Sequence, residues 1–326
     1  MYPLKFENIY FDKIWGGRDF QLFRSNMPEG NIGESWDVAC HPHGTSFVAN
    51  GEFKGMKLDQ LIKLKGSEII GSHISEAWFP LLVKLINAKD KLSVQVHPDD
   101  KYGKEAEGEM GKTEAWYVVE ACEGASLVVG TKNCTREQFK KAIEGGEFDK
   151  FLNKIPVHKG DVYFVKSGLI HAIDEGVIIA EIQQNSDTTY RVYDYNRGRD
   201  LHIDKALDVA DLSLIGEKSK GLKVQQEGYN KIYYCLCEHF ALELYEVVES
   251  FKECSDSERF YIFTAVEGEG EIFSKGKSEA IKKGDSILIP ASLGEYEVRG
   301  AVKLLKSYVP NINKAKEEIL RNVVVE

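Results

Sequence analysis

The sequence lacks an excess of basic side chains and lacks any long apolar run. Its 326 residues include 42 lysines and arginines against 52 aspartates and glutamates, which gives a formal net charge of −10. A chain this acidic is a poor partner for nucleic acid or for an anionic membrane surface. No segment reaches the roughly 18 apolar residues that a membrane-spanning helix needs. We therefore expect neither a nucleic-acid nor a membrane partner.

The features of a secreted protein are also missing. The N-terminal stretch "MYPLKFENIYFDKIWGG" has no apolar core and no small-residue cleavage site, so we expect a cytoplasmic protein made without export. Cysteine is scarce: six residues, none of them in a C-x-x-C pair, stand at positions 40, 122, 134, 235, 237 and 254. Scattered cysteines in a long cytoplasmic chain favour reduced, mostly buried side chains over a disulfide framework.

Helical periodicity is limited, and short strand-like runs dominate the chain. β-Branched and aromatic runs such as "AWYVVEA", "VIIAEIQQ" and "FALELYEVV" recur between glycine turns. Evenly spaced runs of this kind predict a sandwich or barrel and not alternating βαβ units. Helical spacing appears at residues 56–64, 135–145 and 202–212, and the second of these opens with a Thr-x-x-Gln capping box. The polar stretch near residues 215–225 predicts a linker.

The segment "KLSVQVHPDD", residues 91–100, places polar side chains on one face of a predicted strand. Ser93, Gln95 and His97 alternate with two valines, and Pro98 ends the run. Such a stripe is either the solvated face of an edge strand or the lining of a cavity in which His97 binds a metal. For this window alone, the solvated edge strand is the commoner case.

The two halves of the chain share a repeated segment. Residues 159–173, "KGDVYFVKSGLIHAI", align with residues 283–297, "KGDSILIPASLGEYE". Repeated β modules in one chain predict two similar barrels. We expect an N-terminal barrel with helical insertions at residues 1–220 and a C-terminal barrel at residues 221–326.

The repeat also separates the two modules by their chemistry. In this register Glu114 falls on Glu258, and His171 falls on Glu295. The second copy has no Gln-x-His strand before it. We therefore expect the first barrel to keep a set of metal-ligand residues and the second to have lost it.

Several motifs resemble one known family. "LSVQVHPDD", "GKTEAWYVV", "SGLIHAI" and "EIQQNSDTTYR" are similar, in order and spacing, to motifs of the type I phosphomannose isomerases of the cupin superfamily. "FDKIWGG" and "IGESWDVACHPHGTS" fit the short bacterial form, so the resemblance runs essentially end to end. Two departures are Ile173, where many members have tyrosine, and the absence of a large helical insertion found in longer members. The resemblance implies a mainly β fold of two cupin-type β-barrels (jelly-roll) with a few helices.

The resemblance also implies a function. It predicts a zinc-dependent aldose–ketose isomerase that interconverts mannose 6-phosphate and fructose 6-phosphate through a cis-enediol intermediate. Gln95, His97, Glu114 and His171 match the family's zinc ligands, with one ion per chain. Two imidazoles, one carboxylate and one amide oxygen suit an open, catalytic zinc site. The expected partner is a small-molecule sugar phosphate, and the chain is expected to be a monomer or a small homo-oligomer.

Five further residues are candidates for catalysis or substrate binding. Arg191 matches an active-site arginine of the family and would stabilise enediolate charge, although a surface arginine is the commoner case. Glu181 lies among apolar residues of a predicted strand, where burial would raise its proton affinity and make it a general base. Lys112 is the third catalytic candidate, within reach of the sugar or its phosphate. Lys84 and Ser93 would bind the substrate, since the chain has no phosphate-binding loop.

Two other functions remain open at this stage. A cupin could bind a sugar without chemistry, or a two-histidine, one-carboxylate set could hold iron for an oxidation. The complete ligand set together with Arg191 in one copy favours the isomerase, and Gln95 as a fourth ligand weighs against iron.

A second His-x-His occurs at His41 and His43. The proline and glycine beside them predict a surface loop that could border the pocket, and no glutamate follows at barrel spacing. We therefore do not expect a metal there.

Overall fold

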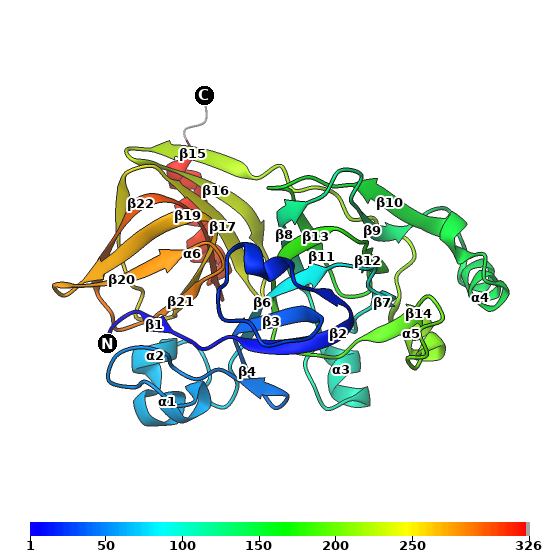
Figure 1. The fold of residues 1–326 in the computed structure, drawn as a ribbon, viewed down its shortest axis with the longest axis horizontal. Coiled ribbons are helices and arrows are strands. Elements are labelled where there is room, and N and C mark those ends of the chain that lie inside the picture. Colours follow the sequence, from blue (N-terminus) through cyan, green and yellow to red (C-terminus); the bar gives the residue numbers. More distant parts are fainter. Residues whose placement is uncertain (324–326) are drawn as a thin grey trace.

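Most of the regular structure is β-strand, arranged as three large antiparallel sheets (Figure 1). The computed structural model describes residues 1–323. This architecture confirms the predicted mainly β fold.

Two sheets face each other in the first half of the chain. The six-stranded sheet runs in the order β11 (Val162–Val165), β8 (Glu114–Ala121), β13 (Val177–Gln184), β6 (Leu81–Ala88), β3 (Ile32–Val38) and β2 (Ile9–Gly17). The five-stranded sheet runs in the order β10 (Leu152–Pro156), β9 (Ser126–Thr131), β12 (His171–Ile173), β7 (Val94–Val96) and β14 (Tyr190–Tyr193). Their facing sides share one apolar cluster, in which Trp116 and Ile179 of the first sheet pack with Leu127 and Val129 of the second.

The third sheet is built almost wholly from the second half of the chain. Its order is β1 (Leu4–Lys5), β21 (Ser286–Ile289), β19 (Tyr261–Ser274), β22 (Glu295–Tyr308), β17 (Ala241–Val247), β16 (Tyr229–Leu236) and β15 (Leu222–Gln226). Two further strands, β18 (Ser250–Cys254) and β20 (Lys277–Lys282), pair with β22 and β19. Because β1 pairs with β21, the first residues of the chain belong to this sheet and not to the sheets of the first half.

The three predicted helical segments are confirmed as α1 (Leu58–Lys65), α4 (Arg136–Gly145) and α5 (Ile203–Val209). The capping box of α4 is present, since the backbone N–H of Gln138 donates to Thr135 Oγ1 at 3.2 Å and the backbone N–H of Thr135 donates to Gln138 Oε1 at 2.9 Å. Among the elements that the sequence did not predict are α2 (Ser67–Ile70), α3 (Asp100–Ala106), α6 (Ile312–Asn322), two 3-10 turns (Asp19–Leu22 and Phe148–Phe151) and the short strands β4 (Cys40–His41) and β5 (Gly44–Thr45).

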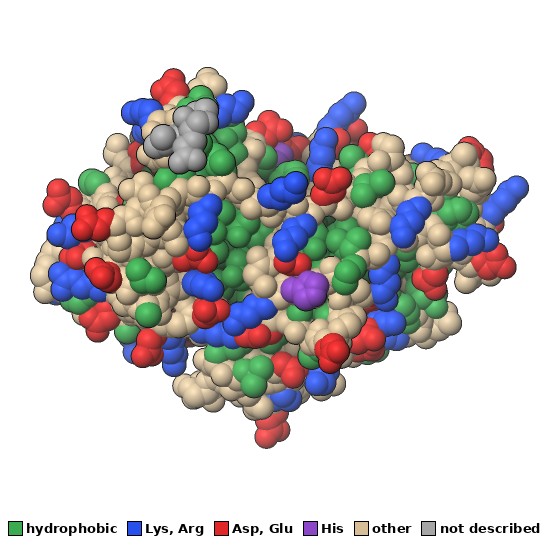
Figure 2. Space-filling view, turned by 90° about the horizontal axis from the view of Figure 1, so that it is seen from above, with side chains coloured by type: hydrophobic (Ala, Val, Ile, Leu, Met, Phe, Trp, Pro, Cys, Tyr) green, Lys and Arg blue, Asp and Glu red, His purple; other side chains and the backbone are tan. Residues whose placement is uncertain are grey.

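The surface carries charge of both signs. Figure 2 shows lysine and arginine side chains interspersed with aspartate and glutamate across one face of the molecule. Within residues 1–323, none of the helices has the length and apolar character required to cross a membrane. All six cysteines are free, as predicted, but the expectation that most are buried is wrong: Cys122 and Cys254 are exposed and the other four are half-buried.

Strand pairing corrects one part of the predicted repeat. In the two KGD segments, Val165 of β11 corresponds to Ile289 of β21. Val165 lies opposite Glu114 on β8, whereas Ile289 lies opposite Tyr261 on β19. The residue that corresponds to Glu114 is therefore Tyr261 and not Glu258, because the second module has a different spacing before its KGD segment.

Candidate active site

The two facing sheets bring the predicted site residues to one place between them. On the five-stranded sheet, Gln95 of β7 lies opposite His171 of β12 and Arg191 of β14, and His97 directly follows β7. The six-stranded sheet contributes Lys84 from β6, Glu114 from β8 and Glu181 from β13. The valines that alternate with Gln95 point away, into an apolar cluster with α4 and α5. Gln95 therefore belongs to a cavity lining and not to a solvated edge.

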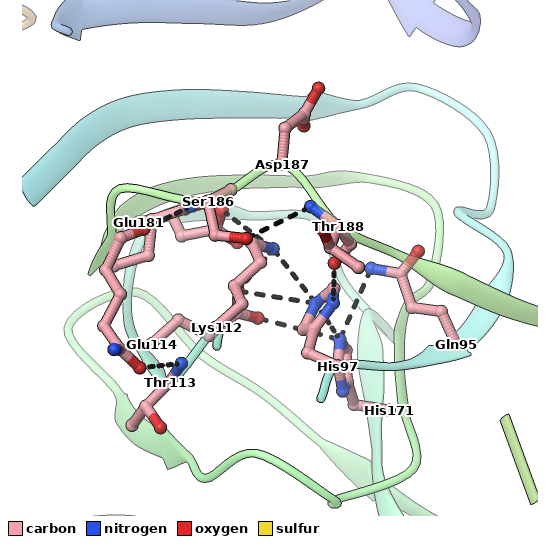
Figure 3. A network of polar contacts seen from close by, with 12 residues as sticks. Gln95, His97, Lys112, Thr113, Glu114, His171, Glu181, Ser186, Asp187 and Thr188 are labelled. Carbon is pink, nitrogen blue, oxygen red and sulfur yellow. Dashed lines mark hydrogen bonds and ion pairs between the residues drawn. The ribbon is translucent and has the colours of Figure 1, made fainter. Parts of the chain in front are cut away.

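Three of the four predicted ligands form a buried group that could hold a metal ion. The candidate ligand atoms of His97, Glu114 and His171 all lie within 4.8 Å of one another. The Nε2 atoms of His97 and His171 are 3.1 Å apart, and each lies 3.6 Å from a carboxylate oxygen of Glu114 (Figure 3). Each of the three residues is at most 1% exposed.

The hydrogen bonds of the two imidazoles determine which nitrogen faces this group. Nδ1 of His97 lies 2.9 Å from the carbonyl oxygen of Thr188, and Nδ1 of His171 lies 2.8 Å from that of Leu169. Since a carbonyl oxygen only accepts, each Nδ1 carries a proton and each Nε2 of a neutral ring presents a lone pair. Burial lowers the pKa of both rings, that of His171 to about 4, so both are neutral near pH 7. Two lone pairs that converge in this way suit a shared cation.

Glu114 adds negative charge without hydrogen-bond donors. Both of its carboxylate oxygens are buried and form no hydrogen bond with the described residues. Burial, followed by the charge of Glu181, raises the pKa of Glu114. The ammonium of Lys112 lies 2.6 Å from one oxygen, outside hydrogen-bond geometry, and 3.0 Å from His97 Nε2. Two imidazole nitrogens and a carboxylate are ligand types that a divalent metal takes, so this set fits a bound metal that would share the carboxylate with Lys112.

Gln95 lies beside the metal group, but the nitrogen of its side-chain amide, and not the oxygen, faces that group. Its Nε2 is 3.3 Å from His171 Nε2, while its Oε1 accepts a hydrogen bond from the Ser93 hydroxyl at 3.1 Å. Metals bind the oxygen of an amide. Coordination by Gln95 therefore requires the amide to turn over and to release Ser93.

Glu181 is buried as predicted, but the predicted rise in its pKa is wrong. Burial alone would raise the pKa, and the charges of Lys84 and Lys112 outweigh it, so the net pKa of Glu181 is lowered. Lys84 Nζ lies 2.9 Å from Glu181 Oε1, and the indole N–H of Trp116 donates to Oε2 at 2.8 Å. Glu181 is thus a stabilised carboxylate near pH 7.

A charged cavity opens beside the metal group. The predicted residues that line it are Lys84, Ser93, Gln95, Lys112, Glu181 and Arg191. The sequence reasoning missed Lys13, Glu34, Asp187 and Arg199, which line it as well. Glu34 is an acidic residue within β3, a strand in which every residue is buried. Its carboxylate lies 3.8 Å from Lys84 Nζ.

Arg191 is distinguished from the other cations of the cavity by its lack of an ionic partner. Lys13 pairs with Glu34 at 3.1 Å, and Arg199 donates to Asp194 at 2.8 Å. Within residues 1–323, Arg191 forms no ion pair, and its buried Nε has no acceptor. Its guanidinium is therefore available to an anion in the cavity.

His41 and His43 differ in their exposure. The prediction of a surface loop is wrong for His41, which lies in the β4–β5 hairpin and is 2% exposed. His43 is exposed, and its Nδ1 lies 3.1 Å from Asp187 Oδ2. Neither histidine lines the cavity, and the motif approaches it only through the contact of His43 with Asp187.

Comparison with known proteins assigns the family. The chain is 36% identical over 313 residues to a curated mannose-6-phosphate isomerase of Streptococcus mutans, with 94% of this chain and 98% of the relative covered. The chain belongs to the mannose-6-phosphate isomerase family. A second relative in the family, a mannose-6-phosphate isomerase of Bacillus subtilis, is 35% identical, with 94% of this chain and 99% of the relative covered.

The fold and the domain models agree with this family. A crystal structure of the mannose 6-phosphate isomerase from Bacillus subtilis is similar with a TM-score of 0.89 and 33% identity, over 94% of this chain and 99% of that one. Residues 4–127 match the catalytic domain of type I phosphomannose isomerases, and residues 230–309 match the cupin domain of mannose-6-phosphate isomerases. His171 and Arg191 lie between the two matched segments, so their assignment depends on the geometry described above.

Proposed function

We propose that the protein is a zinc-dependent isomerase that interconverts mannose 6-phosphate and fructose 6-phosphate through a cis-enediol intermediate. The observation that carries the proposal is the convergence of two imidazole Nε2 atoms and the buried carboxylate of Glu114 within 4.8 Å of one another, beside a cavity lined by cations. A site with these donors and an adjacent cavity matches a catalytic metal centre better than a closed structural one.

His97, Glu114 and His171 would hold the zinc ion, with the oxygen of Gln95 as a fourth donor once its amide turns over. When bound, zinc supplies Lewis-acid polarisation of sugar oxygens at the reacting carbons. The carbonyl groups of Thr188 and Leu169 would hold both rings in the tautomer that a metal needs.

The chain's own groups would stabilise and move charge around the substrate. Arg191 would bind the developing enediolate, because its charge has no internal partner. Lys112 would bind the sugar or its phosphate. Lys84 and Ser93 line the same cavity and would bind the substrate. Glu181, which is ionised and lies between Lys84 and Trp116, would be the base that accepts the proton. Its lowered pKa means that its affinity for that proton is low.

We also propose that residues 221–326 form a second barrel without a metal site. By strand pairing, the ion triad Glu34, Lys84 and Glu181 corresponds to Lys231, Glu243 and Lys306, in which every charge is reversed. Lys306 Nζ lies 3.9 Å from the ring centre of Tyr261, the residue in the place of Glu114, and 2.6 Å from Glu253. The buried lysines Lys231 and Lys306 therefore neutralise the carboxylates of Glu243 and Glu253 in this module.

Replacement of Glu258 or Glu295 tests this second module. Glu258 pairs with Arg259 and Lys314 near the surface, and Glu295 is exposed. Glu258→Ala and Glu295→Ala should each leave the turnover rate within a few-fold and the metal content unchanged. Metal analysis together with a rate assay checks this, and loss of metal in either variant would show that the second module shares in the site.

A coupled assay tests the proposed activity itself. The metal-loaded protein, mixed with mannose 6-phosphate, should form fructose 6-phosphate at a rate proportional to enzyme concentration. A cupin that only binds the sugar would bind mannose 6-phosphate in a calorimetric titration yet form no product. Binding without turnover would therefore refute the isomerase and favour the binding protein.

A further inference from the structure

The turn Ser186–Thr188 connects the metal group to the cavity. It follows β13 and passes over Lys112 and His97 (Figure 3). The carbonyl oxygen of Thr188 accepts the Nδ1–H of His97, and Asp187 lines the cavity. The position of this turn therefore sets both the orientation of one proposed metal ligand and the place of a cavity carboxylate.

One carboxylate outside the metal group holds this turn. Glu109 lies between α3 and β8, and its Oε2 lies within hydrogen-bond reach of three donors of the turn. These are the Ser186 hydroxyl at 3.1 Å, the backbone N–H of Asp187 at 3.3 Å and the Thr188 hydroxyl at 3.0 Å. Hydrogen bonds to an ionised acceptor are stronger than neutral ones, so the three contacts together fix the turn.

The second oxygen of Glu109 faces a buried histidine, without a hydrogen bond between them. His41 Nε2 lies 3.5 Å from Glu109 Oε1, and His41 is buried in the β4–β5 hairpin. The same hairpin is tied to the segment before the turn, because the Asn185 amide donates to the carbonyl oxygen of Cys40 at 2.9 Å. The hairpin that carries the His-x-His motif therefore packs beside Glu109 and is hydrogen-bonded to the residue before the turn.

We infer that Glu109 is a positioning residue of the site. Its carboxylate fixes the turn Ser186–Thr188, and through the Thr188 carbonyl it fixes the His97 ring in the orientation that a metal requires. Residues that orient a metal-binding histidine in this way contribute strongly to metal affinity although they do not touch the metal. The inference rests on the proposed metal site.

The test measures zinc affinity in variants of Glu109. Glu109→Ala should bind zinc about 10- to 100-fold more weakly than the parent in competition with a chelating dye. Glu109→Gln should fall between the two, since an amide oxygen still accepts hydrogen bonds but carries no charge. Glu107→Ala is the matched control, because Glu107 belongs to the same segment but binds Tyr190 and Lys205 instead of the turn. Its zinc affinity should stay within two-fold of the parent.

The melting temperature of the metal-free proteins separates positioning from general destabilisation. It should be similar for Glu109→Gln and Glu107→Ala, while only the first loses zinc affinity. Parent-like zinc binding by both Glu109 variants, or equal weakening by Glu107→Ala, would overturn the inference and leave the proposed activity intact. A parent protein that binds zinc but does not convert mannose 6-phosphate would refute the proposed activity and leave the role of Glu109 intact.

Discussion

His171→Ala is expected to lose bound zinc and isomerase activity together. His171 supplies one of the two converging Nε2 atoms, and its removal leaves Glu114 and His97 as the remaining strong ligands. A catalytic zinc site needs three protein ligands, so the variant should retain little metal after dialysis. Activity should fall to the background of the assay, because without the metal the sugar oxygens lose their Lewis acid.

Metal content and activity should be measured on the same preparation of His171→Ala. The matched control is His158→Ala, because His158 is an exposed histidine on the same half of the chain whose side chain lies near Asp161 and is not part of the metal group. The control should keep both metal and rate. Normal activity in His171→Ala, or metal loss without loss of activity, would contradict the assignment of His171 as a ligand of a catalytic metal.

Arg191→Ala should lower kcat by about 10²- to 10³-fold, as expected when one preorganised donor to a transition-state charge is removed. Zinc content should not change, since Arg191 is not among the three residues of the metal group. KM should change little, because contacts made only in the transition state affect kcat and not ground-state binding. Steady-state kinetics with metal analysis of the purified variant check all three values.

Arg191→Lys distinguishes the geometry of the guanidinium from its charge. A lysine restores the charge but not the planar pair of donors, so it should recover only part of the lost rate. If KM rises steeply in Arg191→Ala while kcat is retained, Arg191 binds the phosphate. The stabilisation of the enediolate would then have to come from Lys112 and the metal.

The metal group was predicted because several local motifs together resemble one family, whereas the strand period around Gln95 alone favoured a solvated edge. A two-residue period places Gln95 and the following histidine on one face of a strand, and the KGD segment places His171 at a fixed distance from its glycine. Three separate segments then needed only a common fold to meet. The pairing of β7 with β12, and the packing of their sheet against the sheet that contains β8, supply it. The three predicted helices also had local signals, in their apolar spacing and in the capping box of α4.

The remaining features depend on contacts between distant segments. Burial of Glu181 was read correctly, but its pKa follows from Lys84 on the neighbouring strand, which only the β6–β13 pairing places 2.9 Å away. His41 was assigned to a surface loop because proline and glycine dominate its local sequence, whereas contact with Glu109 and the strand core buries it. The correspondence between Glu114 in the first module and Tyr261 in the second likewise follows from strand pairing, which no single segment of the sequence reveals.

Chelation followed by zinc addition tests the central claim most directly. Treatment with a chelator should abolish the conversion of mannose 6-phosphate, and one equivalent of zinc per chain should restore it. The circular dichroism spectrum should stay native throughout, because three sheets with extensive apolar cores do not need a metal to fold, unlike a small zinc module. Full activity in protein shown to be free of metal would contradict the proposed role of His97, Glu114 and His171.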